Sequence, residues 1–398
     1  MQEFAYSRFA ISLFLVLVPS TFAICQTAPR DFQFGPSGQT TVALSDQSTI
    51  EATINGKGPF KLFFDTGASV NILNPEVIAQ LGLTSEGGQN ELQGFAGGKV
   101  EAKPYRADEL RIGDLTLAGP TFYSIPMPLP ITGIVGAVGY ELMSRLIINA
   151  DNERQQLTFY DPAQFVYNDA GEKLELLPDE YELIVHATIG KIPGDFILDT
   201  GAAGNIGISL NHWFAQRYHL PHHLLHHLYY KVASRGADGD TPPGKLDRIK
   251  TLCLGTACVP DILGEFYHGD DKSQYAGRIG NDVLRRFTFT IDWQHRAVFL
   301  KRTSRWDQTS VYNQTGLDLN PEDSGSALVV AEVYPHSPAS QAHIHVGDRI
   351  LFIDNRPPQQ TWYSDDPAFL QSAGTVVTLT IQHNKSSQQI KLKLKDIL

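Results

Sequence analysis

The sequence predicts a mainly β protein, with two related lobes followed by a smaller α+β domain. An internal repeat is the first reason: the LFFDTGA of 62–68 returns as FILDTGA at 196–202. Short apolar runs that alternate with glycine-containing turns are the second, since this pattern is typical of β-sheet proteins. The composition agrees, because 34 glycines and 23 prolines provide frequent turns and 42% hydrophobic residues can fill packed cores.

The length of 398 residues also favours two or three domains. The predicted order is a signal peptide (1–23), a linker (24–38), lobe 1 (39–165), lobe 2 (172–302) and a C-terminal domain (308–398). The formal net charge of −11 would repel a phosphate backbone, so we expect no nucleic-acid binding.

The N-terminus is typical of an export signal. Arg8 precedes the apolar run 9–18, and small residues at 21–23 offer a cleavage site. The run is shorter than the roughly 20 residues of a membrane span, although an uncleaved anchor remains an alternative. A lipid-modified Cys25 is disfavoured by Ile24, which stands where a small residue is usual. We expect a periplasmic or secreted protein of bacterial type, with no membrane span after signal cleavage.

Two cysteines in lobe 2 suggest a disulfide. If Gly255-Thr256 forms a two-residue hairpin turn, Cys253 and Cys258 become a close cross-strand pair. An exported protein favours the oxidised bridge, with two free buried thiols as the alternative.

The repeat extends beyond its Asp-Thr-Gly segments. The runs 50–54, 110–113 and 136–139 are matched in the same order by 185–189, 252–255 and 277–280. A purely structural repeat would need only the hydrophobic pattern. It would not need both copies to keep an aspartate between an apolar strand and Thr-Gly.

Asp65 and Asp199 suit acid–base chemistry as a pair. Hydrolysis of a peptide bond needs an activated water molecule and a proton for the carbonyl oxygen and then for the amine. Two carboxyl groups about 3 Å apart can provide both, because they cannot both ionise readily and so share one proton. Taken singly, each aspartate could equally be a turn former at the end of a strand.

The segments 64–69 and 198–203 resemble the active-site loops of retropepsin-like aspartic proteases. The apolar-Gly pairs that this family packs behind each loop correspond to 138–139 and 279–280. The resemblance implies two pseudo-twofold-related β-barrel lobes in one chain, with Asp65 and Asp199 as the catalytic dyad at their interface. It also implies that Thr66 and Thr200 exchange hydrogen bonds across the interface. The predicted supporting residues of the loops are Thr66, Gly67, Thr200, Gly201, Gly139 and Gly280.

The third position after each aspartate bears on pH. Pepsin-like relatives carry a hydroxyl donor there, whereas this chain has Ala68 and Ala202. A missing donor to the ionised form raises the pKa of a carboxyl group. We therefore expect a mildly acidic optimum.

A glycine-rich segment in lobe 1 stands where this family has its substrate-covering flap. It comprises Gly94, Phe95, Ala96, Gly97 and Gly98, and a weaker counterpart lies at 236–240. Ordinary surface turns are the alternative. Five histidines between 219 and 227 include pairs at one-turn helical spacing, but they lack an HExxH pattern, so we expect a surface cluster, no metal and no cofactor.

Residues 308–398 resemble a bacterial PDZ domain. SPA at 337–339 and GDRI at 347–350 carry the resemblance, while His343 replaces the usual glycine in a left-handed position. The resemblance implies that an extended peptide, such as a protein C-terminus, binds as an added strand. The predicted peptide-binding residues are Gly316, Leu317, Asp318 and Leu319. A structural or dimerising role is the alternative.

The sequence as a whole predicts an exported aspartic endopeptidase, a hydrolase acting on peptides or unfolded proteins, with a PDZ domain that binds or presents substrate. One alternative is a catalytically inactive peptide-binding adaptor of the same fold. A second is an enzyme whose only substrate is itself.

Overall fold

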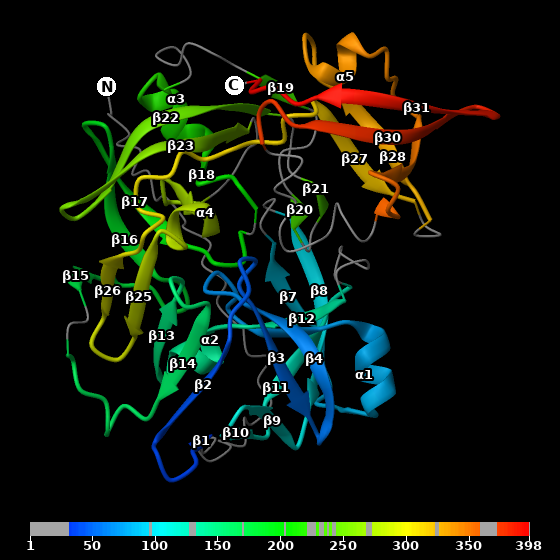
Figure 1. Cartoon of the computed structure of the whole chain (residues 1–398). Helices are drawn as coiled ribbons and strands as arrows, with labels where there is room; N and C mark the ends of the chain where they lie inside the picture. Colours follow the sequence, from blue (N-terminus) through cyan, green and yellow to red (C-terminus); the bar gives the residue numbers. More distant parts are fainter. Residues whose placement is uncertain are drawn as a thin grey trace, which may run out of the picture.

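The computed structural model describes residues 32–397, except 95–97, 127–132, 169–170, 203, 221–227, 231–234, 237–238, 241–243, 268–272, 323–325 and 359–371. The protein is mainly β, as predicted, and three parts follow one another along the chain (Figure 1). The predicted signal peptide and the cysteine at position 25 lie outside the described residues. Among the described residues, no helix combines the length and apolarity needed to cross a membrane.

Lobe 1 contains a large sheet with eleven strands in the described residues. Its strands are β1 (Phe32–Gln33), β3 (Thr49–Ile54), β4 (Lys57–Phe64), β5 (Asn71–Leu73), β6 (Thr84–Ser85), β7 (Asn90–Gln93), β8 (Lys99–Arg106), β9 (Glu109–Ile112), β10 (Leu115–Ala118), β11 (Thr121–Ser124) and β12 (Ile134–Val138). β12 is parallel to β4, which brings Val138 beside Phe64. Both residues are fully buried, so the strand that ends at the first Asp-Thr-Gly is anchored in the core.

Lobe 2 repeats this arrangement. Its sheet contains β16 (Ile184–Ile189), β17 (Ile192–Leu198), β18 (Ile208–Leu210), β19 (Leu228–Tyr230), β22 (Gly244–Leu254), β23 (Ala257–Tyr267) and β24 (Gly277–Ile279). β24 is parallel to β17 and brings Ile279 beside Leu198, as Val138 lies beside Phe64 in lobe 1. A separate small pair consists of β20 (Arg235–Gly236) and β21 (Gly239–Asp240).

A third sheet joins the two lobes. It contains β2 (Gln39–Ala43), β13 (Ile147–Asp151), β14 (Gln156–Tyr160), β15 (Glu172–Glu175), β25 (Phe287–Asp292) and β26 (Ala297–Arg302). β13 of lobe 1 pairs antiparallel with β25 of lobe 2, and the two strands lie side by side in Figure 1. Strand pairing across the boundary holds the repeats in one fixed relation.

The helices are short. They are α1 (Pro75–Leu81), α2 (Tyr140–Met143), α3 (His212–Arg217), α4 (Asn281–Leu284) and α5 (Pro338–Gln341). α1 has the predicted boundaries, with Asn74 before Pro75 and Gly82 in the left-handed region at φ 66°. α2 and α4 follow Gly139 and Gly280, so each apolar-Gly pair is succeeded by a helical turn.

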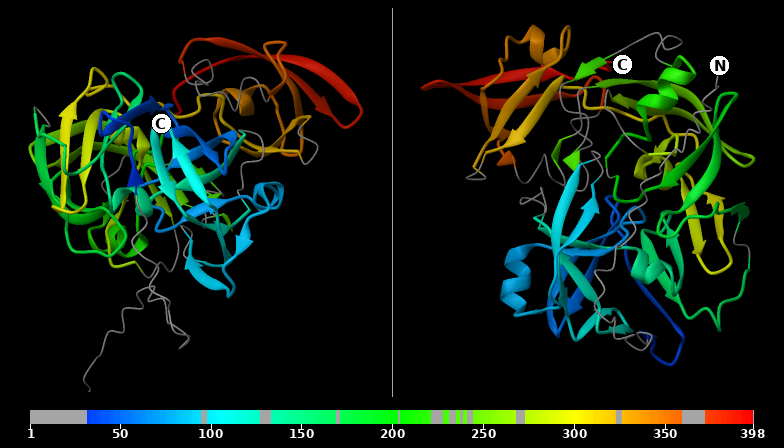
Figure 2. Two further views of the ribbon diagram at one scale, coloured as in Figure 1. Left: turned by 90° about the horizontal axis from the view of Figure 1, so that it is seen from below. Right: turned by 180° about the vertical axis from the view of Figure 1, so that it is seen from behind.

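The PDZ domain forms a five-stranded sheet from β27 (Leu317–Pro321), β28 (Leu328–Val333), β29 (Arg349–Ile353), β30 (Val376–His383) and β31 (Ser386–Lys393). His343 has φ 56°, the left-handed conformation expected at this position. The domain lies next to β22 and β23 of lobe 2 (Figure 2). Buried Tyr334 packs there against Leu246 and Leu263, so the domain is docked on lobe 2.

Two predicted features can be compared with these elements. A disulfide joins Cys253 and Cys258, which are directly opposed where β22 and β23 meet at the Gly255 turn. The predicted linker over 24–38 is wrong at its C-terminal end, because Phe32 pairs with Leu117 of β10 and packs against the core of lobe 1. Lobe 1 therefore includes residues before position 39.

Candidate active site

Each Asp-Thr-Gly begins where a buried strand ends. Asp65 follows β4 and donates its backbone N–H to the carbonyl oxygen of Val138 at 2.9 Å. Asp199 follows β17 and donates in the same way to Ile279 at 3.0 Å. Because both aspartates are fixed by the same parallel strand pair, they occupy equivalent points of the two lobes.

The two loops meet face to face at the lobe boundary. A Cβ atom added to Gly67 would lie 2.7 Å from the carboxyl carbon of Asp199, and one added to Gly201 would overlap the carboxyl group of Asp65. Each aspartate thus rests on the glycine of the opposite loop, where no side chain fits. Asp199 is buried and Asp65 is partly accessible.

Thr66 and Thr200 lock this arrangement. The Thr66 N–H donates to Thr200 Oγ1 at 3.0 Å, and the Thr200 N–H donates to Thr66 Oγ1 at 2.9 Å. Each hydroxyl in turn donates across the boundary, Thr66 to the Leu198 carbonyl at 2.7 Å and Thr200 to the Phe64 carbonyl at 2.5 Å. Both threonines are almost fully buried. This reciprocal exchange fixes the separation of the loops that carry the aspartates.

The glycines of the apolar-Gly pairs support the loops from behind. A Cβ atom on Gly139 would lie 2.6 Å from the carbonyl oxygen of Asp65, and one on Gly280 would lie 2.9 Å from that of Ile206. Real Cβ contacts are longer than this, so both positions require glycine for close packing. The six predicted supporting residues all lie in or directly behind the two loops.

The two carboxylates differ in their partners. Asp65 Oδ1 accepts the Gly67 N–H at 2.8 Å. Asp199 Oδ1 accepts the Ala202 N–H at 3.0 Å, and Asp199 Oδ2 accepts Nη1 of Arg278 at 3.1 Å. The ionised form of Asp199 is therefore stabilised by a cation in direct contact, which Asp65 lacks among these contacts.

Arg278 and Glu182 were missed by the sequence analysis. Arg278 lies on β24, and its Nη2 donates to Glu182 at 3.1 Å. Burial raises the pKa of Glu182, Arg278 lowers it, and the charges of Asp179 and Asp199 raise it further. The repeat contained an indication of this pair, since Arg278 occupies the position that Ala137 has in lobe 1.

The pKa of Asp65 is raised to about 7. Burial is the largest cause, followed by the charge of Asp199, while the Gly67 amide and Arg278 act in the opposite direction. A hydrogen bond between the two carboxyl groups also raises it. Near neutral pH, Asp65 can therefore keep a proton beside an ionised partner, as the shared-proton chemistry requires.

The raised pKa predicts that Asp65 destabilises the fold at alkaline pH. Between about pH 4 and 7 the folded protein retains a proton that the unfolded chain has lost, so stability falls as the pH rises through this range. Asparagine has no proton to lose. Asp65→Asn should therefore be more stable than wild type at pH 8, by at most about 4 kcal/mol, and nearly equal at pH 3.5. Thermal unfolding at both pH values measures this, and equal midpoints at pH 8 would contradict the assignment.

The flap segment is described only in part. β7 and β8 form a hairpin, and Gly94 donates its N–H to the carbonyl of Gly98 at 2.9 Å at the base of its tip. Residues 95–97 lie outside the described residues, and so do the tip of the weaker counterpart at 237–238 and the histidines at 222–227.

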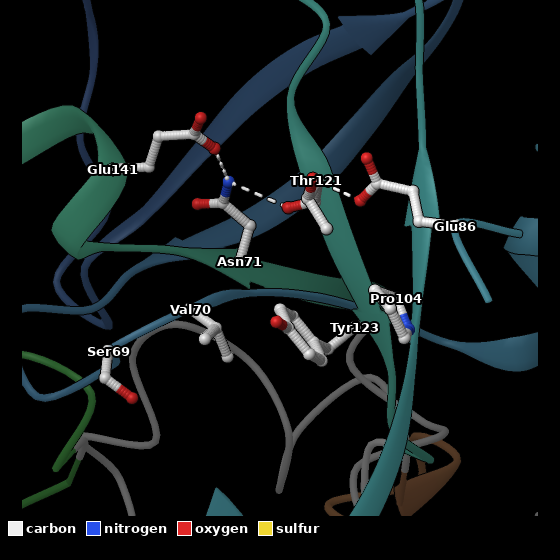
Figure 3. A pocket seen from close by; sticks show the side chains of 8 residues that line it. All are labelled: Ser69, Val70, Asn71, Glu86, Pro104, Thr121, Tyr123 and Glu141. Carbon is white, nitrogen blue, oxygen red and sulfur yellow. Dashed lines mark hydrogen bonds between the residues drawn. The ribbon is translucent and has the colours of Figure 1, made fainter. Parts of the chain in front are cut away.

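A cavity of about 310 Å³ opens beside the loop of Asp65 (Figure 3). Asn71 lies in its wall and donates to Glu141 at 2.6 Å and to the Thr121 carbonyl at 3.2 Å. The cavity is lined by Ser69, Val70, Asn71, Glu86, Pro104, Thr121, Tyr123 and Glu141. Ser69 and Val70 directly follow the catalytic loop, so the cavity is continuous with the segment that carries Asp65.

The predicted peptide-binding residues of the PDZ domain lie at one edge of its sheet. Gly316 adopts φ 77°, and a Cβ atom there would overlap Ser337. Leu317, Asp318 and Leu319 belong to β27, the first strand in the sheet order, which pairs with β28. Both leucines are buried, so their side chains support the domain core while the strand backbone forms the edge.

Comparison with protein-family models matches residues 50–138 to the aspartyl protease family and residues 314–394 to the PDZ domain family. The first match runs from β3 to the end of β12 and includes Asp65. None of the curated proteins compared matches the chain. The chain therefore contains a retropepsin-like aspartyl protease domain at residues 50–138 and a PDZ domain at residues 314–394.

Proposed function

We propose that the protein is an exported aspartic endopeptidase that hydrolyses peptide bonds with a water molecule activated by Asp65 and Asp199. The observation that carries the proposal is the meeting of the two loops, in which each carboxyl group packs against the glycine of the other loop. A single polypeptide supplies both aspartates, so one chain forms a complete dyad.

The contacts of the dyad suggest distinct roles for its members. Asp199, bonded to Arg278 and to the Ala202 amide, is the ionised base. Asp65, whose pKa is raised to about 7, holds the shared proton and is the acid. Arg278 acts through Asp199 and is a positioning residue, since it keeps the negative charge on that carboxylate.

The reaction then proceeds in two balanced steps. Asp199 takes a proton from water as the oxygen attacks the carbonyl carbon, and Asp65 gives its proton to the carbonyl oxygen. In the second step the C–N bond breaks, the proton on Asp199 passes to the leaving amine, and a hydroxyl proton returns to Asp65. The products are a carboxylic acid and an amine, and both carboxyl groups regain their starting protonation.

Substrate binding draws on the surroundings of the dyad. The cavity beside Ser69 has the volume to receive one substrate side chain on the lobe 1 side of the scissile bond. The β7–β8 hairpin is a candidate cover that excludes water during the reaction. The substrates we propose are peptides or unfolded proteins, because a chain must be extended to lie across two lobes.

An inactive adaptor of the same fold is the alternative. The retained dyad and its threonine exchange argue against it, because peptide binding alone does not require two carboxyl groups held together in a buried site. Incubating the purified protein with an unfolded protein at pH 5–6, with and without pepstatin, tests the proposal. We expect cleavage that pepstatin reduces; absence of cleavage across pH 3–8 would favour the adaptor.

We further propose that the PDZ domain tethers substrate by its C-terminal carboxylate. Tethering raises the local concentration of a long substrate at the cleft without changing the chemistry. Amidating the C-terminus of an unfolded substrate should therefore raise KM by about tenfold or more and leave kcat unchanged. A short peptide that cannot reach both sites serves as the control. Equal KM values for the acid and amide forms of the long substrate would refute tethering.

A further inference from the structure

Three side chains that commonly bind metals meet on the PDZ domain, outside the dyad. They are His345 and Asp348, in the turn that leads into β29, and His383, the last residue of β30. One potential ligand atom from each lies within 4.8 Å of the other two. The sequence analysis expected no metal, because these histidines are far apart in the chain and only the fold brings them together.

The backbone fixes the positions of all three residues. The Asp348 N–H donates to the His345 carbonyl at 3.1 Å, which closes the turn. The pairing of Arg349 with Gln382 places His383 next to Asp348 on the neighbouring strand. Since a tight turn and a strand pair hold the ligands, a metal ion would find them largely organised in advance.

Asp348 is suited to be the central ligand. It is buried, with 4% of its surface exposed. Its Oδ2 accepts the His345 N–H at 3.0 Å, and its Oδ1 lies 2.5 Å from Nδ1 of His383. A hydrogen bond from the backbone orients a ligating carboxylate in the way that supporting contacts do in known metal sites.

The two imidazoles complete the set from the solvent side. The side chain of His383 is 52% exposed, and its ring centroid lies 5.9 Å from that of His345. The bond between Asp348 and His383 alone would tie β30 to the turn, and it would not need a second imidazole at the same point. Exposed rings can rotate, so closing 4.8 Å to the roughly 3.3 Å between ligands of a tetrahedral zinc ion requires only small movements.

We propose that His345, Asp348 and His383 bind a Zn²⁺ ion, with solvent completing the coordination. Two imidazole nitrogens and one carboxylate oxygen form a donor set that zinc favours over magnesium or calcium. The ion would link the turn before β29 to the β30–β31 hairpin. Because neutral imidazoles are required, zinc should be released as the pH falls from 7.5 to 5.

Titration calorimetry of the full-length protein with Zn²⁺ at pH 7.5 tests the site. The histidines at 219–227 could bind zinc as well, so the measurement is the difference between variants. We expect His345→Ala and His383→Ala each to bind one equivalent less than wild type, or to bind that equivalent at least 30-fold more weakly. His336→Ala, which removes an exposed histidine of the same domain outside the cluster, should match wild type.

His345→Ala is the decisive variant, because a purely structural hydrogen bond between Asp348 and His383 does not involve its ring. Both replaced histidines are exposed, and circular dichroism establishes that the variants remain folded. Zinc stoichiometry and affinity unchanged in His345→Ala would overturn the proposal. So would an equal loss in His336→Ala.

Discussion

Asp65→Asn and Asp199→Asn are each expected to lower kcat at least about 10³-fold on an unfolded protein substrate, since acid–base catalysis contributes up to about 10⁴-fold. The amide that replaces the carboxyl group can neither take a proton from water nor deliver one to the carbonyl oxygen. Its shape is nearly the same, so the packing against the opposite glycine and the threonine exchange should persist. Initial rates of cleavage at pH 5–6 measure the effect.

Asp195→Asn is the matched control. Asp195 lies on β17, in the same strand that leads to Asp199, but its side chain is 48% exposed and bonds to His186. This variant should cleave at the wild-type rate. If either dyad variant retained more than a tenth of the wild-type kcat, the proposed chemistry would be wrong.

Replacing Arg278 by glutamine should shift the whole pH–rate profile to higher pH. Arg278 contacts Asp199 and also lowers the pKa of Asp65, so without it both carboxyl groups hold protons more tightly. An arginine in contact lowers the pKa of a carboxyl group by about 1–3 units, so the acid limb should rise by at least about one unit. At pH 4–5 this corresponds to a loss of about tenfold or more in kcat/KM.

Two further variants separate this role from a structural one. Arg278→Lys keeps the cation and should return the acid limb close to the wild-type position. Glu182→Gln removes a negative charge that competes for Arg278 and should move the acid limb to lower pH. The other groups near this pair, Asp179 and Tyr275, bond to each other and stay unchanged in all variants. A uniform loss of rate at every pH in Arg278→Gln would indicate that Arg278 only supports the fold.

The sequence was sufficient to predict the organisation of the protease lobes because the repeat is chemical as well as hydrophobic. Each Asp-Thr-Gly follows a buried strand, and each apolar-Gly pair lies beside it on a parallel strand. The boundaries of α1 were also predictable, since Pro75 and Gly82 are strong local determinants. The exchange between Thr66 and Thr200 was expected from family resemblance, because single-sequence patterns do not define contacts across a lobe boundary.

Contacts between distant segments were not predictable. Glu182 precedes β16 and Arg278 lies on β24, so their approach to Asp199 depends on the completed sheet. The same holds for His345 and His383, which the β29–β30 pairing brings together. The linker prediction was wrong at Phe32 because a two-residue strand is too short for a hydrophobic pattern to reveal.

Mixing the two inactive variants tests most directly whether one chain forms one dyad. Asp65→Asn and Asp199→Asn are unfolded together, refolded as a mixture and assayed on an unfolded protein substrate. If both aspartates of each site come from the same polypeptide, every site carries one asparagine and the mixture stays inactive. Recovery of a substantial fraction of wild-type cleavage would mean that sites form between chains, and it would contradict the assembly of Asp65 and Asp199 described above.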